Sequence, residues 1–165
     1  MTKTPSQTVG PYYAIGLSRR VQNELVPPDD PSAVVLRGEL LDGEGTPITD
    51  GLIEVWEPVE RRWGRCGTHP VDGRPGGSFS FVISIPEARP GHAPHLEIYV
   101  HARGLLKHQR TRMYFPDELD ANAADPVLAG LAEADRARLV AAREDGGLRF
   151  DIHMQGARET VFFAT

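Results

Sequence analysis

The sequence predicts an all-β protein: a β-sandwich of about seven or more mostly antiparallel strands, with a short helical excursion near residues 117–145. Three observations lead to this prediction. Several short segments alternate apolar and polar residues with a period of two, which is typical of half-buried strands. Turn-forming residues are abundant, with 17 Gly and 14 Pro in 165 residues. Strands and helices do not alternate along the chain, which disfavours a parallel α/β fold.

The first segment, residues 1–33, is predicted to be an extended arm that precedes a single sandwich domain over residues 34–165. Prolines at positions 27, 28 and 31 exclude a helix interior there, because each proline fixes φ and removes a backbone donor. The arm also carries two neighbouring tyrosines, Tyr12 and Tyr13. Such rings favour burial against a surface, so we expect the arm to dock rather than remain free.

The alternation predicts seven strands. In the first, Leu36 and Leu40 share one face, and Arg37 and Glu39 share the other. The clearest alternation lies in residues 78–85, where Phe79, Phe81, Ile83 and Ile85 are predicted to face inward. The complete set of predicted strands is residues 34–41, 52–56, 78–85, 95–100, 111–115, 148–154 and 160–163.

One region departs from the strand pattern. Asp125 followed by Pro126 is a typical helix start, with an acidic cap and proline at the first helical position. Gly130 is predicted to divide the run into two short helices, and the pair Gly146–Gly147 to end it. The residues expected along the buried helical stripe are Leu128, Leu131, Ala132, Leu139 and Ala142.

Composition excludes several classes of protein. A net charge of −5 argues against nucleic-acid binding, which needs positive charge to displace counterions. No run of about 18 apolar residues is present, so no membrane helix is predicted. The first residues lack the apolar core of a signal peptide. The single cysteine, Cys66, excludes an internal disulfide and fits a reducing compartment. We therefore expect a cytoplasmic protein.

The predicted strand 95–100 carries polar residues that could bind a metal or take part in catalysis. Leu96, Ile98 and Val100 are expected inward, so His95, Glu97, Tyr99 and His101 share the opposite face. His95 and Glu97 could reach one metal and, with a distant third ligand such as His153, form a 2-His-1-carboxylate iron(II) site. On spacing alone, a His–Glu pair at a surface or interface is the commoner outcome.

A further group of motifs is spread along the chain. It comprises residues 4–12 (TPSQTVGPY), 93–95 (APH), 102–105 (ARGL), 111–115 (TRMYF), 125–128 (DPVL), 149–152 (RFDI), 155–156 (QG) and 159–163 (ETVFF). Together these motifs resemble one family, the α subunits of heteromeric intradiol ring-cleavage dioxygenases. The resemblance runs from residue 4 to residue 163, and its most specific parts are the opening and closing motifs.

The resemblance implies a β-sandwich and a partner. In this family a catalytic β subunit binds one non-haem Fe(III) through two tyrosines and two histidines, whereas the α subunit lacks a working site. The two histidines form an H-x-H motif, which here reads His95-Leu96-Glu97. No tyrosine lies between Trp56 and Pro94, where the tyrosine ligands are expected. The resemblance therefore implies no catalytic residue and no metal in this chain, with His95 and Glu97 as a vestigial position.

The positive role implied for this chain lies in its arm. In this family the α-subunit arm approaches the iron pocket of the β subunit, which would place Thr8, Gly10, Pro11 and Tyr12 beside a small aromatic substrate. Arg103, in the ARG motif, is a candidate to bind the substrate carboxylate or to form an ion pair across the subunit interface. The implied reaction converts protocatechuate and O2 to 3-carboxy-cis,cis-muconate, in a higher hetero-oligomer of α–β pairs.

The chain departs from the family pattern at one loop, and two alternative functions remain open. Only six residues, 57–62, separate Trp56 from Trp63, where the family has a much longer loop. That shortening affects the part of the subunit contact that this loop would make and leaves the arm untouched. The first alternative function is a self-contained non-haem iron enzyme that uses His95 and Glu97. The second is a β-sandwich binding module with no catalytic partner.

Overall fold

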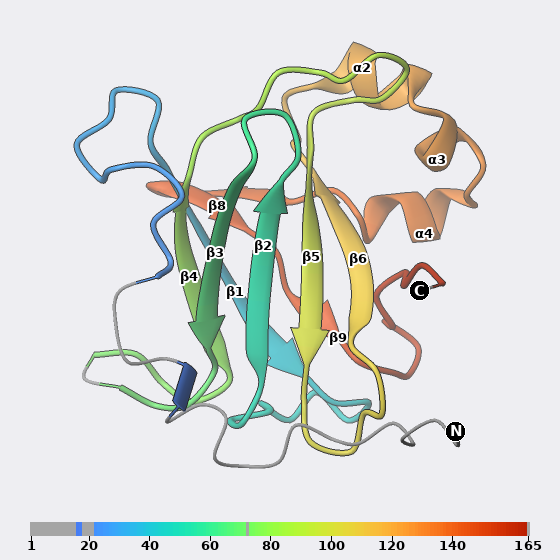
Figure 1. Ribbon diagram of the computed structural model, residues 1–165. Helices are drawn as coiled ribbons and strands as arrows, with labels where there is room; N and C mark the ends of the chain where they lie inside the picture. The colour runs from blue at the N-terminus through green and yellow to red at the C-terminus, as the bar shows by residue number, and fades with distance from the viewer. Residues whose placement is uncertain (1–15, 18–21, 72, 165) are drawn as a thin grey trace, which may run out of the picture.

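The computed structural model describes residues 16–17, 22–71 and 73–164 and folds into two facing β-sheets (Figure 1). One sheet has four strands in the order β3-β2-β5-β6, all antiparallel. The other has the order β4-β1-β8-β7, with β9 paired to β1. The predicted all-β sandwich with a helical excursion is therefore confirmed.

The strands and helices follow in this order along the chain. The strands are β1 (Val34–Leu41), β2 (Leu52–Glu57), β3 (Arg62–Gly67), β4 (Ser78–Ile83), β5 (His95–His101), β6 (Gln109–Tyr114), β7 (Ala142–Glu144), β8 (Gly147–Arg149) and β9 (Ile152–His153). The helices α2 (Leu119–Ala124), α3 (Pro126–Ala129) and α4 (Glu133–Ala137) lie beside β6 at one end of the sandwich (Figure 1). None of the helices described is long and apolar enough to cross a membrane.

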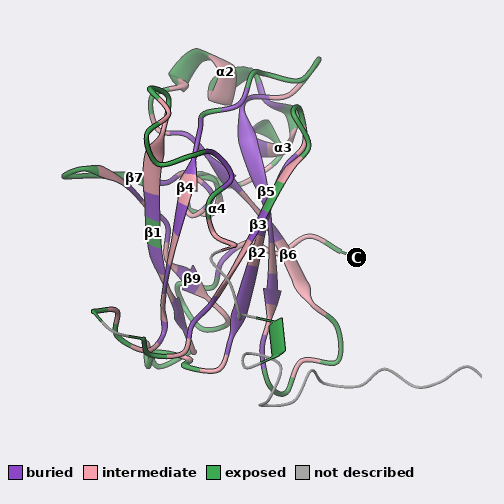
Figure 2. Cartoon of the chain, turned by 60° about the vertical axis from the view of Figure 1, so that its left-hand side comes forward, coloured by how far each residue is buried: buried purple, intermediate pink, exposed green. Residues whose placement is uncertain are grey.

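The apolar core fills the space between the two sheets (Figure 2). Leu36 and Leu40 of β1 are fully buried, whereas Arg37 is exposed, as the alternation predicts. Leu96, Ile98 and Val100 of β5 are likewise fully buried. Because the inward side of β5 is apolar and continuous, its polar residues all lie on the outer face of the four-stranded sheet.

Several predicted strands have different limits in the structure. The strand predicted at 78–85 ends at Ile83, so Ile85 lies outside it and is exposed rather than inward. The segment 148–154 forms two short strands, β8 and β9, with residues 150–151 between them. The segment 160–163 is not a strand, because only Phe163 forms a bridge, to Arg110. The predicted alternation therefore identifies buried residues better than strand ends.

Strand β3 and the end of the helical region correct the sequence analysis. Residues 62–67 are not among the predicted strands, but they pair along their whole length with β2. The helical region ends before its predicted limit, because residues 142–144 form β7 and pair with β8. Gly146, at φ +80°, makes the tight turn between these two strands. Ala142 is therefore an exposed strand residue and not part of a buried helical stripe.

The N-terminal cap of α3 and the break at Gly130 are confirmed. The Asp125 side chain accepts hydrogen bonds from the backbone of Val127 and Leu128, and Pro126 occupies the first turn. Gly130 follows α3 directly and separates it from α4.

The described end of the predicted arm closes one edge of the sandwich. Gln22 accepts a backbone hydrogen bond from Arg65 of β3 at 2.7 Å, and Asn23 accepts one from Val82 of β4 at 2.8 Å. The segment therefore bridges the edge strands of both sheets. Leu25 follows and is buried against the core. The rest of the predicted arm, residues 1–15 and 18–21, lies outside the described residues.

Candidate functional site

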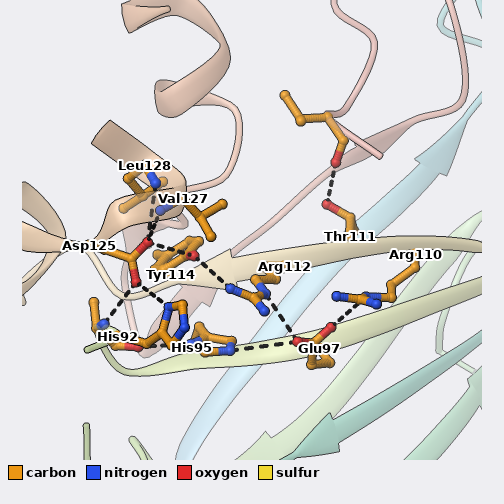
Figure 3. Close-up of polar contacts among 12 residues, drawn as sticks. His92, His95, Glu97, Arg110, Thr111, Arg112, Tyr114, Asp125, Val127 and Leu128 are labelled. Atoms are coloured by element: carbon orange, nitrogen blue, oxygen red, sulfur yellow. Dashed lines mark hydrogen bonds and ion pairs between the residues drawn. The ribbon is translucent and has the colours of Figure 1, made fainter. Parts of the chain in front are cut away.

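His95 and Glu97 lie side by side on the outer face of β5, as their spacing predicts (Figure 3). His95 Nε2 is 3.7 Å from Glu97 Oε1, which is an electrostatic contact and too long for a hydrogen bond. His95 Nδ1 lies 2.8 Å from the carbonyl oxygen of Ala93, so Nδ1 carries the donated proton. Both side chains are buried, at 1% and 10% exposure. The pair is therefore part of the protein interior rather than a surface ion pair.

Two arginines from β6 hold the Glu97 carboxylate. Arg110 Nε donates to Oε2 at 2.9 Å, and Arg112 Nε donates to Oε1 at 3.0 Å (Figure 3). Burial alone would raise the pKa of Glu97. The neighbouring His95 imidazole and the two guanidinium charges outweigh burial and lower that pKa to about 2. Glu97 is therefore ionised and fully engaged within this chain.

Asp125 connects this cluster to helix α3. Its Oδ1 accepts hydrogen bonds from the Tyr114 hydroxyl at 3.2 Å and from two backbone N–H groups at the start of α3. Its Oδ2 accepts from the backbone of Ala93 at 2.9 Å and lies 3.3 Å from His92 Nδ1. Burial favours the neutral acid, but these donors outweigh it and lower the pKa of Asp125.

Tyr114 and Arg112 complete the network. Arg112 Nη1 donates to the Tyr114 hydroxyl at 3.4 Å, so Arg112 contacts Glu97 and Tyr114 at once. Tyr114 is fully buried, and this burial together with the Asp125 charge raises the pKa of its hydroxyl to about 12. The network runs continuously from Glu97 through Arg112 and Tyr114 to Asp125. It therefore ties β5, β6 and α3 together (Figure 3).

These residues do not fit an iron ion. Among the described residues, no group of three His, Cys, Asp or Glu side chains could hold a metal. The structure does not bring His153, the predicted third ligand, to this site, because it lies in β9 on the other sheet. The guanidinium groups of Arg110 and Arg112 also occupy both oxygens of Glu97. The chemistry of this cluster is that of a structural ion-pair network.

Arg110, Arg112, Tyr114 and Asp125 are the residues of this network that sequence reasoning did not connect. A usable signal was present, because Arg110, Arg112 and Tyr114 alternate along β6 and must share one face. The register then places Arg112 directly opposite Glu97. That register, and not the residue types, was the missing information.

Arg103 lies just beyond β5, in the turn that leads to β6. Its side chain is 68% exposed, and its Nε is 3.1 Å from Asp50 Oδ2. The other predicted pocket residues, Thr8, Gly10, Pro11 and Tyr12, lie outside the described residues.

A hollow lies further along the same sheet face. It has a volume of about 390 Å³ and is lined by Glu54, Trp56, Trp63, Tyr99, His101 and His108. The hydrogen bond from His101 and the charge of Arg65 lower the pKa of Glu54. The short turn between β2 and β3 borders this region. The buried Glu57 carboxylate closes that turn by accepting the backbone N–H groups of Val59 and Glu60 at 2.6 and 2.8 Å.

Comparison with known proteins identifies relatives over almost the whole chain. The protocatechuate 3,4-dioxygenase alpha chain of Burkholderia cepacia is 37% identical and covers 99% of this chain and 98% of its own. The alpha chain of Pseudomonas putida is 35% identical, and the alignment covers 99% of this chain and 96% of the relative. The alignment with the former spans 194 positions, more than the 165 residues of this chain. The relative therefore carries residues that have no counterpart here.

A beta chain is also similar. The protocatechuate 3,4-dioxygenase beta chain of B. cepacia is 29% identical and covers 77% of this chain and 66% of its own. No family model matches the chain.

Solved structures support the same fold. The dioxygenase domain of a dioxygenase–carbohydrate-binding fusion from Streptomyces sp. SirexAA-E superposes with a TM-score of 0.63 at 22% identity, covering 94% of this chain and all of its own. An intradiol ring-cleavage dioxygenase from Tetranychus urticae superposes with a TM-score of 0.54 at 14% identity, covering 93% of each chain. At these identities the likeness shows the fold alone. The alpha-chain relatives, in contrast, show that this chain belongs to the family of protocatechuate 3,4-dioxygenase alpha chains, the alpha subunits of heteromeric intradiol dioxygenases.

Proposed function

We propose that this chain completes the active-site pocket of a catalytic beta chain and supports their assembly, while contributing no metal ligand of its own. The observation that carries the proposal is the state of the His95–Glu97 position. Glu97 is bound by Arg110 and Arg112 at hydrogen-bond distance, so its carboxylate is not available to a metal. In this proposal the non-haem Fe(III) implied by the family resides in the beta chain.

The substrate proposed is protocatechuate, after the names of the alpha-chain relatives. Protocatechuate carries a carboxylate, and a guanidinium group binds a carboxylate through two parallel hydrogen bonds. Arg103 suits this role because it is largely exposed and, among the described residues, forms one ion pair, to Asp50. We place it at the rim of the partner's pocket, where it would attract or orient the substrate.

The arm is proposed to line the same pocket. Gly10 permits a close approach of the backbone, and Pro11 fixes the direction of the chain. Tyr12 would add a rigid aromatic wall with one hydroxyl, and Thr8 a second hydrogen-bonding group. These roles come from the family resemblance of residues 4–12. In this proposal both the arm and Arg103 act on a substrate held by the other subunit.

The outer face of the four-stranded sheet is proposed as part of the contact between the subunits. Trp63 on this face is 40% exposed, and the hollow beside it has mainly aromatic walls. Exposed aromatic residues are enriched at protein interfaces. The similarity between this chain and a beta chain favours two related folds packed around a pseudo-two-fold axis, repeated in a larger hetero-oligomer. Because Cys66 is a free thiol, we further propose action in the reducing cytoplasm.

The experiment compares this chain purified alone with the chain co-expressed with its beta partner. Iron content and protocatechuate cleavage are measured in both preparations. The proposal expects iron and activity only in the co-purified complex. Stoichiometric iron with ring cleavage in the lone chain would favour the self-contained enzyme instead. A stable lone chain that never co-purifies with a beta chain would favour the binding module.

A further inference from the structure

We propose that a hollow on the opposite sheet, lined by three arginines, binds a small tetrahedral oxyanion such as a phosphate group. The hollow has a volume of about 350 Å³ and lies over β1, β4 and β8, with the loop at residues 73–75 at its rim. Arg37, Arg74 and Arg149 line it, together with Ser78 and Ser80. It lies on the other sheet from His95 and Glu97, so this inference does not depend on the proposed function.

The strand register brings two of these arginines together. Arg37 of β1 and Arg149 of β8 are direct partners in a parallel pair. Like charges placed opposite each other in a sheet destabilise it unless something compensates them. Arg149 is compensated, because its Nη2 lies 3.0 Å from Asp151 Oδ1 and 3.4 Å from Glu39 Oε2. Arg37 has no ion pair with any residue that the structure describes.

Arg74 adds a second guanidinium without a described carboxylate partner. Arg74 is partly buried, and its Nη1 donates to the backbone carbonyl of Ser78. A guanidinium group has five N–H donors, so this one contact leaves several donors unused. Within the described part of the chain, no carboxylate forms an ion pair with Arg74. Partial burial of a charge without a counter-ion is unfavourable, and a bound anion would relieve it.

The shape of the site favours a tetrahedral ligand over a planar one. The three guanidinium groups come from separate segments, namely two neighbouring strands and a loop. A planar carboxylate is satisfied by one guanidinium group, whereas the oxygens of a phosphate point in several directions. The Ser80 hydroxyl adds a further donor at the wall. Glu39 also lines the hollow and opposes an anion, but its carboxylate is engaged with Arg149. The ligand is therefore expected between Arg37 and Arg74.

The test measures binding of inorganic phosphate to the alpha–beta complex by isothermal titration calorimetry at low ionic strength. Saturable binding is expected, and replacement of either Arg37 or Arg74 by Gln should weaken it about tenfold, the value of one hydrogen bond to a charged group. Arg89→Gln is the matched control, because Arg89 is exposed and lies outside the hollow. This control should leave the affinity unchanged, and thermal melting should confirm that all three variants fold.

Two further titrations identify the ligand. Glycerol phosphate replaces inorganic phosphate to distinguish a phosphate ester from the free ion, and acetate at matched ionic strength tests a planar anion. Tighter binding of either phosphate than of acetate supports the proposal. Equal binding of acetate, binding unchanged in Arg37→Gln and Arg74→Gln, or no saturable binding at all would overturn it. Ring cleavage should remain unchanged in all the variants, so failure of this inference leaves the proposed function intact.

Discussion

Glu97 and Arg112 are direct partners across β5 and β6, with Arg112 Nε 3.0 Å from Glu97 Oε1. The family resemblance matches Glu97 to the second histidine of the H-x-H motif, and Arg112 lies on the neighbouring strand. A guanidinium group thus lies beside this carboxylate, on the same sheet face as His95. The pair is nearly buried, at 10% and 13% exposure, so it interacts in a medium that screens charge poorly. Replacement of either Glu97 or Arg112 should therefore destabilise the fold.

Replacement of Glu97 by Gln should destabilise the fold by about 3 kcal/mol, because it leaves two guanidinium groups facing a neutral side chain. The measurement is the free energy of unfolding in urea. Glu87→Gln is the control, since Glu87 is exposed and forms no hydrogen bond or ion pair with a described residue. This change should alter the stability by less than about 0.5 kcal/mol. Equal stability of Glu97→Gln and the parent chain would show that the ion pairs are solvated.

Stability should also depend on pH through the same carboxylate. The pKa of Glu97 is lowered from 4.5 to about 2 in the folded chain, so the folded state holds the proton less tightly than the unfolded state. The stabilisation is therefore complete above pH 4.5 and is lost as the pH falls toward 2. The loss is on the order of 3 kcal/mol. Urea midpoints between pH 6 and pH 2.5 should fall less steeply in Glu97→Gln. Parallel slopes in the two proteins would contradict the assignment.

The Tyr114 hydroxyl should contribute separately. Tyr114→Phe removes a hydrogen bond to Asp125 at 3.2 Å and one from Arg112 at 3.4 Å, at a cost of about 1 kcal/mol. Tyr99→Phe is the matched control, because the Tyr99 hydroxyl forms no hydrogen bond with a described residue. Unfolding free energies of the two variants provide the test. Similar unfolding free energies for the two variants would mean that the hydrogen bonds of the Tyr114 hydroxyl do not stabilise the fold.

The sequence predicted the sandwich because its core is built from short, regular alternations. Leu96, Ile98 and Val100 are an example, since period-two burial alone identifies their face. Strand β3 was missed because its residues, including Gly64 and Cys66, lack a clear apolar alternation. Its place is set by pairing with β2. The helical region was predicted to reach Gly146–Gly147 because Ala142 falls on the same helical stripe as Leu139. Pairing of residues 142–144 with β8 outweighs that weak periodicity.

The candidate site shows the same limit. The shared face of His95 and Glu97 follows from their spacing, but the arginines bound to Glu97 follow from which strand lies next to β5. A single sequence carries no direct record of strand pairing. The consequence for function is large, because His95 and Glu97 alone suggest a metal site. With Arg110 and Arg112 beside them, they form a structural network instead.

Tyr12→Ala in the assembled enzyme tests the role of the arm. The KM for protocatechuate should rise, because an aromatic wall of the pocket is removed, while the iron content per beta chain stays the same. Iron is measured by mass spectrometry and KM by oxygen consumption. Leu119→Ala provides a control, since Leu119 is exposed on α2 and lies outside both the arm and the hollow. A loss of iron in Tyr12→Ala would contradict the proposed role, because the arm would then support the metal site itself.

Arg103→Ala tests recognition of the substrate carboxylate. If Arg103 binds this group, the KM for protocatechuate should rise by about tenfold, the value of one charge-assisted hydrogen bond. The KM for catechol, which has no carboxylate, should not change. Arg103→Lys keeps the charge but loses the bidentate geometry, and it should restore only part of the affinity. Asp50→Asn removes the observed ion pair at 3.1 Å and separates this restraint on Arg103 from direct recognition. A parallel rise in KM for both substrates, with weaker co-purification of the beta chain, would instead assign Arg103 to an ion pair across the subunit interface.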